Sequence, residues 1–133
     1  MKKEIISTQN APAAVGPYSQ AVKLGNFLFC SGQVGIDPQN EKLVSGGIIA
    51  ETKQIFKNIK SILIASGFIT EEITKVNIYM TDIKAFQSVN EIYSLFFKNI
   101  DKLPVRSTVE ISALPLGASI EIEITAIKCD NKD

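Results

Sequence analysis

The chain has 133 residues, the usual length of one domain, and a chain of this size can fold without a disulfide or a metal ion. Its 14 basic residues balance 14 acidic residues, which excludes the strong basic excess typical of proteins that bind nucleic-acid phosphates. Histidine does not occur in the sequence, and this excludes histidine-dependent catalytic triads and HExxH-type metal sites.

The N-terminal half predicts a β-hairpin, a long loop and a helix. Gly25 and Asn26 form a tight-turn signal between two short strands. Turn-forming residues then fill the loop that follows the hairpin. Farther on, apolar residues recur every three or four positions before Gly67, which stands where a left-handed helix cap belongs. The predicted elements are an edge strand Lys3–Ser7, strands Ser19–Leu24 and Phe27–Ser31, and a helix over Ile49–Ser66.

The C-terminal half predicts three strands and a second helix. Three segments alternate between apolar and polar residues, which is typical of half-buried strands. Asp82 is a candidate helix cap after the first of them, and Pro104 closes the helical region. The predicted elements are strand Thr74–Thr81, a helix with the apolar stripe Phe86, Val89, Tyr93, Phe96 and Ile100, and strands Val105–Ile111 and Ser119–Ile127. The core order is therefore ββαβαββ, an α+β fold with a mixed sheet, in one domain spanning 1–133.

Two helices can cover only one face of such a sheet, and we expect the face rich in isoleucine and valine to be covered. A polar sheet face is often simply solvated. Phe27 and Phe29, however, are predicted to lie opposite Leu28 and Cys30, and a face that is both apolar and polar fits a subunit interface better than open water. The residues predicted for the uncovered face are Asn77, Tyr79, Arg106, Thr108, Glu110, Glu121 and Glu123.

Arg106 is the only arginine in a chain with thirteen lysines. Lysine cannot reproduce the planar, two-pronged donor geometry that matches a carboxylate, so Arg106 is a candidate site residue. If the strands of Arg106 and Glu121 are neighbours, a guanidinium and a carboxylate meet on one face. Their pairing is either a structural ion pair or part of a site, in which a second carboxylate, Glu110 or Glu123, stays free.

Four further residues are candidates for binding a ligand. Ser31 and Gly32 lie at the end of a predicted strand, where a glycine lets a ligand approach the backbone. Tyr18 either closes a pocket with its ring or packs at a rim. Asn90, in the middle of a predicted helix, either faces water or makes a specific hydrogen bond, and its spacing alone favours water.

The two cysteines and the N-terminal residues indicate in which cellular compartment the protein is expected. Cys30 and Cys129 form no CxxC motif, so neither a zinc site nor a dithiol redox pair is indicated. The first twelve residues are too briefly apolar for a signal peptide, and no run approaches the roughly 18 apolar residues of a membrane span. We expect a cytoplasmic location, reduced thiols and no membrane partner.

Four ordered segments, covering nearly the whole chain, carry a family resemblance. They are NAPAAVGPYSQAV (10–22), CSGQVGIDP (30–38), VNEIYSLFF (89–97) and PVRSTVEISALPLGASIEIEITAI (104–127). Together they resemble the RidA/YjgF family of reactive-intermediate deaminases. The resemblance implies a fold like that of the Bacillus-type chorismate mutase and a homotrimer whose uncovered sheet faces form a central barrel, with active sites between subunits. It also implies hydrolysis of 2-aminoacrylate/2-iminopropanoate and 2-iminobutanoate to 2-oxo acids and ammonia.

The resemblance gives two residues a role in the reaction. Arg106 matches the family's carboxylate-binding arginine, whose donors hold the α-carboxylate by two hydrogen bonds. Glu121 matches the glutamate that positions or activates the hydrolytic water. Water that adds to an iminium carbon must lose a proton and the departing amine must gain one, which a carboxylate can mediate. No metal and no organic cofactor are implied.

The resemblance also assigns supporting positions. Tyr18 matches a ring that covers the substrate, and Ser31 and Gly32 match the loop that lines the pocket. Asn90 matches a pocket-side residue of the second helix, contrary to its spacing. Many bacterial members have a cysteine two residues after the arginine, whereas this chain has Thr108. A thiol nucleophile is therefore excluded at this substrate-binding position, and direct attack by water is favoured.

Functions of other classes stay open. A trimeric small-molecule binder or regulator would use Arg106 to hold a 2-oxo acid or similar anion without turnover. RNA cleavage or translation inhibition, proposed for some relatives, fits poorly with zero net charge and no histidine. Chorismate mutase activity normally needs more than one cation, and the strand faces offer only Arg106. We therefore expect a hydrolase of small imino or enamino acids, without a nucleic-acid partner.

Overall fold

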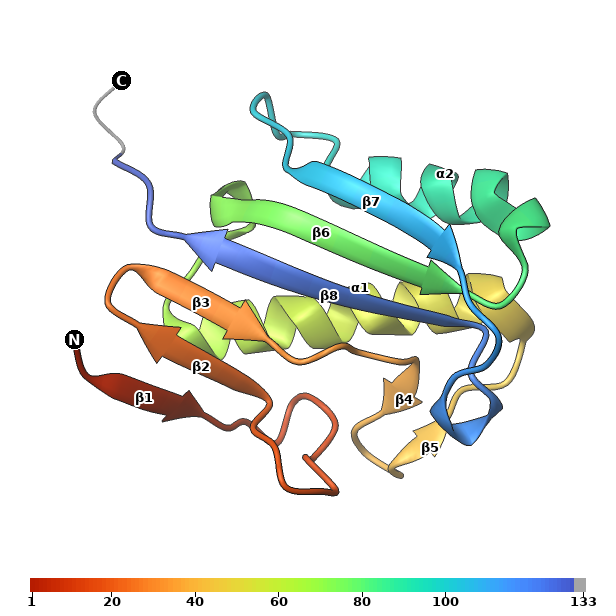
Figure 1. Ribbon diagram of the computed structural model, residues 1–133, viewed down its shortest axis with the longest axis horizontal. Coiled ribbons are helices and arrows are strands. Elements are labelled where there is room, and N and C mark those ends of the chain that lie inside the picture. The colour runs from red at the N-terminus through yellow and green to blue at the C-terminus, as the bar shows by residue number, and fades with distance from the viewer. Residues whose placement is uncertain (131–133) are drawn as a thin grey trace.

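The alternating segments pair into one mixed sheet, and both helices pack against the same face of it (Figure 1). The structure, a computed structural model, describes residues 1–130. The strands are β1 (Lys3–Ile6), β2 (Ala21–Leu24), β3 (Phe27–Cys30), β4 (Ile36–Asp37), β5 (Lys42–Leu43), β6 (Ile73–Met80), β7 (Val105–Glu110) and β8 (Ile120–Ile127), and the helices are α1 (Gly47–Ser66) and α2 (Phe86–Phe96). The large sheet has the spatial order β1-β2-β3-β8-β6-β7.

Local sequence explains how this sheet is connected. Gly25, with φ of 59°, makes the tight turn between the antiparallel strands β2 and β3. Strands β6 and β7 run parallel, because α2 carries the chain back between them. Strand β8 returns antiparallel between β3 and β6, which places it inside the sheet. The last strand of the sequence is therefore flanked by two earlier ones.

The core lies between the sheet and the two helices. Burial of one such aliphatic side chain stabilises the fold by about 1.5–3 kcal/mol. The isoleucine and valine face of β6 and β8 is covered, as predicted from the sequence. The fully buried side chains, each at most 3% exposed, include Val76, Ile78, Ile120, Ile122 and Ile124 from the sheet and Ile55, Ile59 and Ile62 from α1.

The predicted order ββαβαββ, the N-terminal edge strand and both helices are confirmed. Gly67 adopts the left-handed cap expected of it, with φ of 78°. Two local features differ from the prediction. The loop after β3 contains the short β4–β5 hairpin. Asp82 caps a 3-10 turn, Ile83–Ala85, that precedes α2, by accepting a hydrogen bond from the N–H of Lys84 at 3.0 Å.

The prediction that the polar residues of β7 lie on the uncovered face of the sheet is wrong. The register of β6 and β7 pairs Arg106 with Val76, Thr108 with Ile78 and Glu110 with Met80. Residues paired across two strands point to the same face of a sheet. Since their partners on β6 are buried beneath the helices, Arg106, Thr108 and Glu110 lie on the helix side. Glu121 pairs instead with Tyr79 and lies on the open face.

The physical reason is that β7 is an edge strand. Alternation fixes which residues share a face, but it does not say which face is covered. Val105 and Val109, predicted for the covered face, are 65% and 46% exposed on the open face. On the helix side of an edge strand, polar side chains can reach solvent past α2. The pattern in β7 therefore resembles that of β8 while its orientation is opposite.

The open face is apolar on one side of the sheet. Phe27 and Phe29 lie on it as predicted, 39% and 46% exposed, with ring centroids 6.0 Å apart. Ile5 and Val22 share that face by register. Contiguous exposed apolar side chains mark an interaction surface more often than a solvated one. No helix among residues 1–130 is both long enough and apolar enough to cross a membrane.

A buried carboxylate ties the end of β8 to the segment after α1. Glu72 is 3% exposed and accepts hydrogen bonds from the N–H groups of Ile69 and Cys129, at 3.1 and 3.0 Å. The Lys128 ammonium lies 3.3 Å from the same carboxylate. Burial alone would raise the pKa of Glu72, but these donors outweigh it, and the pKa is lowered. The charged form of Glu72 therefore stabilises the folded state.

The sign of this effect sets its pH dependence. A carboxyl with a lowered folded-state pKa stabilises the protein above its unfolded pKa, and the stabilisation is lost as pH falls through the folded value. We predict that Glu72→Gln lowers the free energy of unfolding by about 2 kcal/mol at pH 7. This loss should shrink between about pH 5 and pH 3, as measured by urea unfolding. Glu71→Gln, at an exposed neighbour, is the control, and a pH-independent loss in Glu72→Gln would contradict the prediction.

Candidate active site

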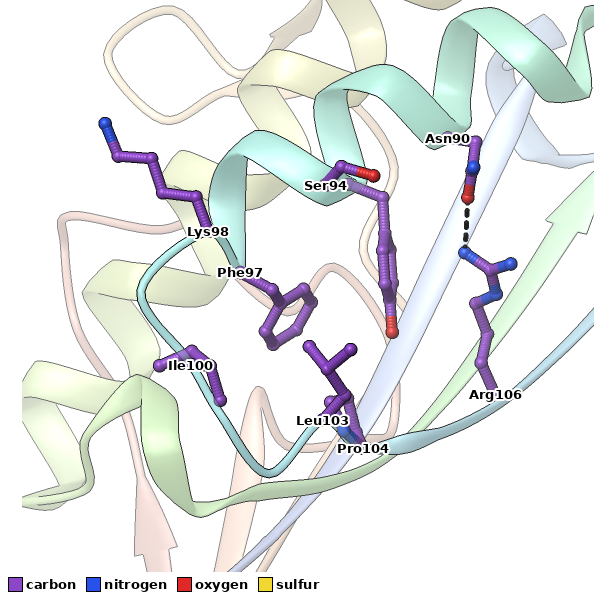
Figure 2. Close-up of a pocket in the computed structure, with 9 residues that line it drawn as sticks. Asn90, Ser94, Phe97, Lys98, Ile100, Leu103, Pro104 and Arg106 are labelled. Carbon is purple, nitrogen blue, oxygen red and sulfur yellow. Dashed lines mark hydrogen bonds between the residues drawn. The ribbon is translucent and has the colours of Figure 1, made fainter.

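Arg106 projects from β7 toward α2 (Figure 2). Its Nη1 donates a hydrogen bond to Oδ1 of Asn90 at 2.7 Å. The guanidinium carbon lies 4.6 Å from the ring centroid of Tyr93 and 5.3 Å from that of Phe86. Aromatic faces attract a cation, so one hydrogen bond and two rings of α2 orient the guanidinium. The interpretation that Asn90 faces only water is wrong, and we call these four residues the arginine side.

The charge of Arg106 is not neutralised by an ion pair. Among residues 1–130 the only ion pair joins Lys128 to Glu72. The hydrogen bond to Asn90 uses one of the five N–H groups of a guanidinium. The pairing of Arg106 with Glu121 that the sequence left open does not form within this chain. Arg106 therefore keeps donors for an external planar anion such as a carboxylate.

A pocket of about 570 Å³ opens beside Arg106. Figure 2 shows Arg106 and Asn90 at one end of it, and both apolar and polar side chains along the rest, among them Phe97, Ile100, Leu103, Ser94 and Lys98. Ligand pockets commonly combine apolar walls with a few polar groups that fix orientation. This arrangement can anchor an anion at the end that Arg106 and Asn90 form.

Thr108 lies two residues after Arg106 on the same face of β7. Its Oγ1 is buried and has no hydrogen-bond partner in the described part of the chain. Orphaned buried polar atoms are uncommon in native proteins. We therefore count Thr108 as a fifth residue of the arginine side, with a hydroxyl that is free to hydrogen-bond to a ligand.

Glu121 and Gly32 meet on the open face, where the start of β8 lies beside the segment that follows β3. A Cβ on Gly32 would lie 2.5 Å from Oε1 of Glu121 and 2.7 Å from its Cδ. The carboxylate thus rests directly against the backbone of Gly32, a contact that only glycine allows. Burial raises the pKa of Glu121, and the negative charge of Glu123 raises it further. A carboxyl with a raised pKa is better suited to pass protons near neutral pH.

Tyr18 and Ser31 lie on the same part of the molecule as Gly32. Tyr18 lines a pocket of about 220 Å³ with Gly32 and another of about 400 Å³ with Ser31. Ser31 is fixed by donating a hydrogen bond from Oγ to the carbonyl of Ser19 at 2.6 Å. The ring of Tyr18 is 52% exposed. The structure therefore groups Tyr18, Ser31, Gly32 and Glu121, and we call this group the glutamate side.

Sequence reasoning missed Gln20, which fixes the loop that carries Tyr18. Gln20 is 4% exposed, and its Nε2 donates to the carbonyls of Thr8, Ala11 and Pro12 at 3.0, 3.2 and 2.7 Å. Its Oε1 accepts from the N–H of Thr8 at 2.7 Å. One amide thereby contacts four backbone groups of the preceding loop, with its two N–H groups shared among the three carbonyls. A single glutamine before an apolar strand gives no signal of burial in the sequence.

The two sides lie on opposite faces of the sheet. Arg106 points to the helix side and Glu121 to the open face, and strand β6 separates their strands. One copy of the chain therefore presents the predicted residues as two separate groups. Among residues 1–130, no three histidine, cysteine, aspartate or glutamate side chains are grouped as metal ligands.

The similarity to known proteins extends over nearly the whole chain and is not confined to one motif. The sequence model of the family described as Endoribonuclease L-PSP matches residues 8–128. A RutC family protein of Aquifex aeolicus is 52% identical over 123 residues, which cover 92% of this chain and 98% of that protein. The human 2-iminobutanoate/2-iminopropanoate deaminase is 44% identical over 126 residues, 95% of this chain and 90% of that protein. The crystal structure of E. coli TdcF with bound serine superposes with a TM-score of 0.89 at 35% identity, covering 95% of this chain and 99% of that one.

Proposed function

The chain belongs to the Endoribonuclease L-PSP family, also called RidA/YjgF, and from this premise we propose that it hydrolyses small imino acids to 2-oxo acids and ammonia. The proposed substrates are 2-aminoacrylate with its tautomer 2-iminopropanoate, and 2-iminobutanoate. Relatives named 2-iminobutanoate/2-iminopropanoate deaminase support this activity. Other relatives carry only the RutC family name.

The observation that carries the proposal is the unpaired guanidinium of Arg106. It is oriented by Asn90 and Tyr93 at one end of a pocket with both apolar and polar walls. An imino acid offers a planar carboxylate next to the reacting carbon, and two N–H groups of a guanidinium match that carboxylate. The serine held by the related TdcF is also a small amino acid with such a carboxylate. Arg106 would thus fix the substrate by its carboxylate and leave the imine free to react.

Glu121 would carry the protons of the reaction. Water adds to the iminium carbon while the C=N pair moves to nitrogen, and the carboxylate of Glu121 takes the proton that water loses. The protonated carboxyl then gives this proton to the amine nitrogen. The C–N bond breaks with its electron pair leaving on nitrogen, and the hydroxyl closes to the carbonyl as its proton passes to ammonia. Glu121 returns to its starting form, and the products are a 2-oxo acid and ammonium.

We place the complete site between two copies of the chain in a homotrimer. The arginine side and the glutamate side lie on opposite faces of one sheet, so a substrate held by Arg106 would need Glu121 from a neighbour. Phe27, Phe29 and Val109 supply exposed apolar surface on the open face, where the family arrangement buries the sheets against one another. Tyr18, Ser31 and Gly32 would come with that Glu121 and line the substrate.

Binding without turnover is the alternative from another class. The same arginine side would hold a 2-oxo acid or a similar anion in a regulatory protein. RNA cleavage, which the family description names, is not favoured, because the chain has zero formal net charge and no histidine.

The variant Arg106→Lys tests the proposed contact between Arg106 and the substrate carboxylate. Lysine keeps the charge but loses the two-pronged geometry, so we predict a fall in kcat/KM of roughly 10- to 100-fold. A serine or threonine dehydratase generates the imine in the assay, and release of the 2-oxo acid is followed with and without this protein. Lys102→Arg, an exposed change in the reverse direction, is the control. No acceleration by the parent protein would contradict the proposed activity.

A second variant separates the enzyme from the binder. Glu121→Gln removes the proton carrier but leaves Arg106 intact, so we predict a loss of turnover of about 100-fold or more. Binding of pyruvate or 2-oxobutanoate, measured by calorimetry, should stay within a few-fold of the parent. Unchanged turnover in this variant would show that Glu121 carries no proton in the reaction.

A further inference from the structure

Four polar side chains form a connected group on the open face, beside the glutamate side. The antiparallel register of β6 and β8 pairs Asn77 with Glu123 and Tyr79 with Glu121. Paired residues share a face, and all four side chains are partly buried there. Two carboxylates, Glu121 and Glu123, therefore stand two residues apart on the same face of one strand.

The hydrogen bonds of this group go to one carboxylate only. Tyr79 donates its hydroxyl to Oε1 of Glu123 at 2.7 Å, and Nδ2 of Asn77 donates to the same oxygen at 3.1 Å. Tyr79 is the direct partner of Glu121 in the sheet, yet its hydroxyl donates its hydrogen bond to Glu123 and not to Glu121. Glu123 is thereby held in place, whereas the carboxylate of Glu121 lies against Gly32.

Glu123 forms no ion pair with a neighbouring cation within residues 1–130. Lys75 is the cation on the same face of β6, and it forms no ion pair within residues 1–130. The neighbouring strand β7 presents Ser107 and Val109 to this face, and β3 presents Phe29. Apart from Lys75, the ionisable groups that face Glu121 from these strands of one copy are Glu123 and Tyr79, and in the shared site proposed above Arg106 of a neighbouring copy faces it as well. The pKa of Tyr79 is raised, chiefly by its hydrogen bond to Glu123 and also by the negative charges of Glu123 and Glu121.

We infer that Glu123, held by Asn77 and Tyr79, is a positioning residue whose fixed negative charge keeps the Glu121 carboxyl able to retain a proton between its two transfers. The inference rests on the proposed function, because it assigns Glu121 the proton-carrying role. A nearby negative charge disfavours a second one, and this effect adds to the burial of Glu121. Without Glu123, burial alone would raise the pKa of Glu121, and the carboxyl would hold the proton from water less firmly until the amine receives it.

The test is a titration of the Glu121 carboxyl that does not depend on turnover. Protein labelled with 13C at the glutamate carboxyls is titrated by NMR, and Glu121 is assigned from the missing signal in Glu121→Gln. In Glu123→Gln, which is nearly isosteric and can still accept from Tyr79, we expect the Glu121 titration to move to lower pH. Glu123→Asp, which keeps the charge, should move it less, and the exposed Glu71→Gln is the control. A Glu121 titration that moves no more in Glu123→Gln than in Glu71→Gln would overturn the inference, as would equal shifts in Glu123→Gln and Glu123→Asp.

The pH profile of the coupled imine assay gives the second readout. The acid limb of kcat/KM, where Glu121 must be a carboxylate to accept a proton, should move to lower pH in Glu123→Gln. A merely structural role of Glu123 would reduce the rate without moving this limb, and that result would also overturn the inference. If the parent protein has no deaminase activity, the proposed function fails, while the NMR titration still decides how Glu123 acts on Glu121.

Discussion

The register in which β6 pairs with its two neighbours determines where every functional side chain of the sheet points. On one side it pairs Val76 with Arg106 and on the other it pairs Tyr79 with Glu121. Because side chains alternate along a strand, these pairings put the arginine and the glutamate on opposite faces. The buried residues of β6 fix this register, since a shift by one position would move them out of the core. A packing constraint in the centre of the sheet thus divides the candidate site into two sides, and this division is the reason we propose a site shared between copies.

The sequence was sufficient to predict the order of elements, the two helices and the covered face of β6 and β8. These features follow from hydrophobic periodicity, which reports burial directly when an element is covered on one side. It failed for β7, where Arg106 and Val109 alternate as regularly as residues in a central strand but face the opposite way. The orientation of β7 depends on its position at the edge of the sheet, and that position depends on which strands become neighbours. A pattern within one strand does not contain that information.

The candidate site was predictable in part. The single arginine stood out by composition, and the resemblance to the family assigned Glu121, Tyr18 and Asn90 their expected roles. Gln20 and the hydrogen bonds of Tyr79 to Glu123 were not predictable, because each depends on contacts between segments distant in the sequence. Glu121 and Glu123 look equivalent as alternate residues of one strand. Only the structure distinguishes the carboxylate that rests on Gly32 from the one held by two donors.

We propose that a working site takes Arg106 from one copy and Glu121 from another, and mixing two impaired variants tests this most directly. Arg106→Lys and Glu121→Gln are unfolded together, refolded in equal amounts, and checked by native mass spectrometry for mixed oligomers. A shared site predicts that about a quarter of the parental deaminase activity returns, because each site then draws an intact arginine and an intact glutamate independently. Mixed oligomers that remain as inactive as the two variants alone would contradict the claim.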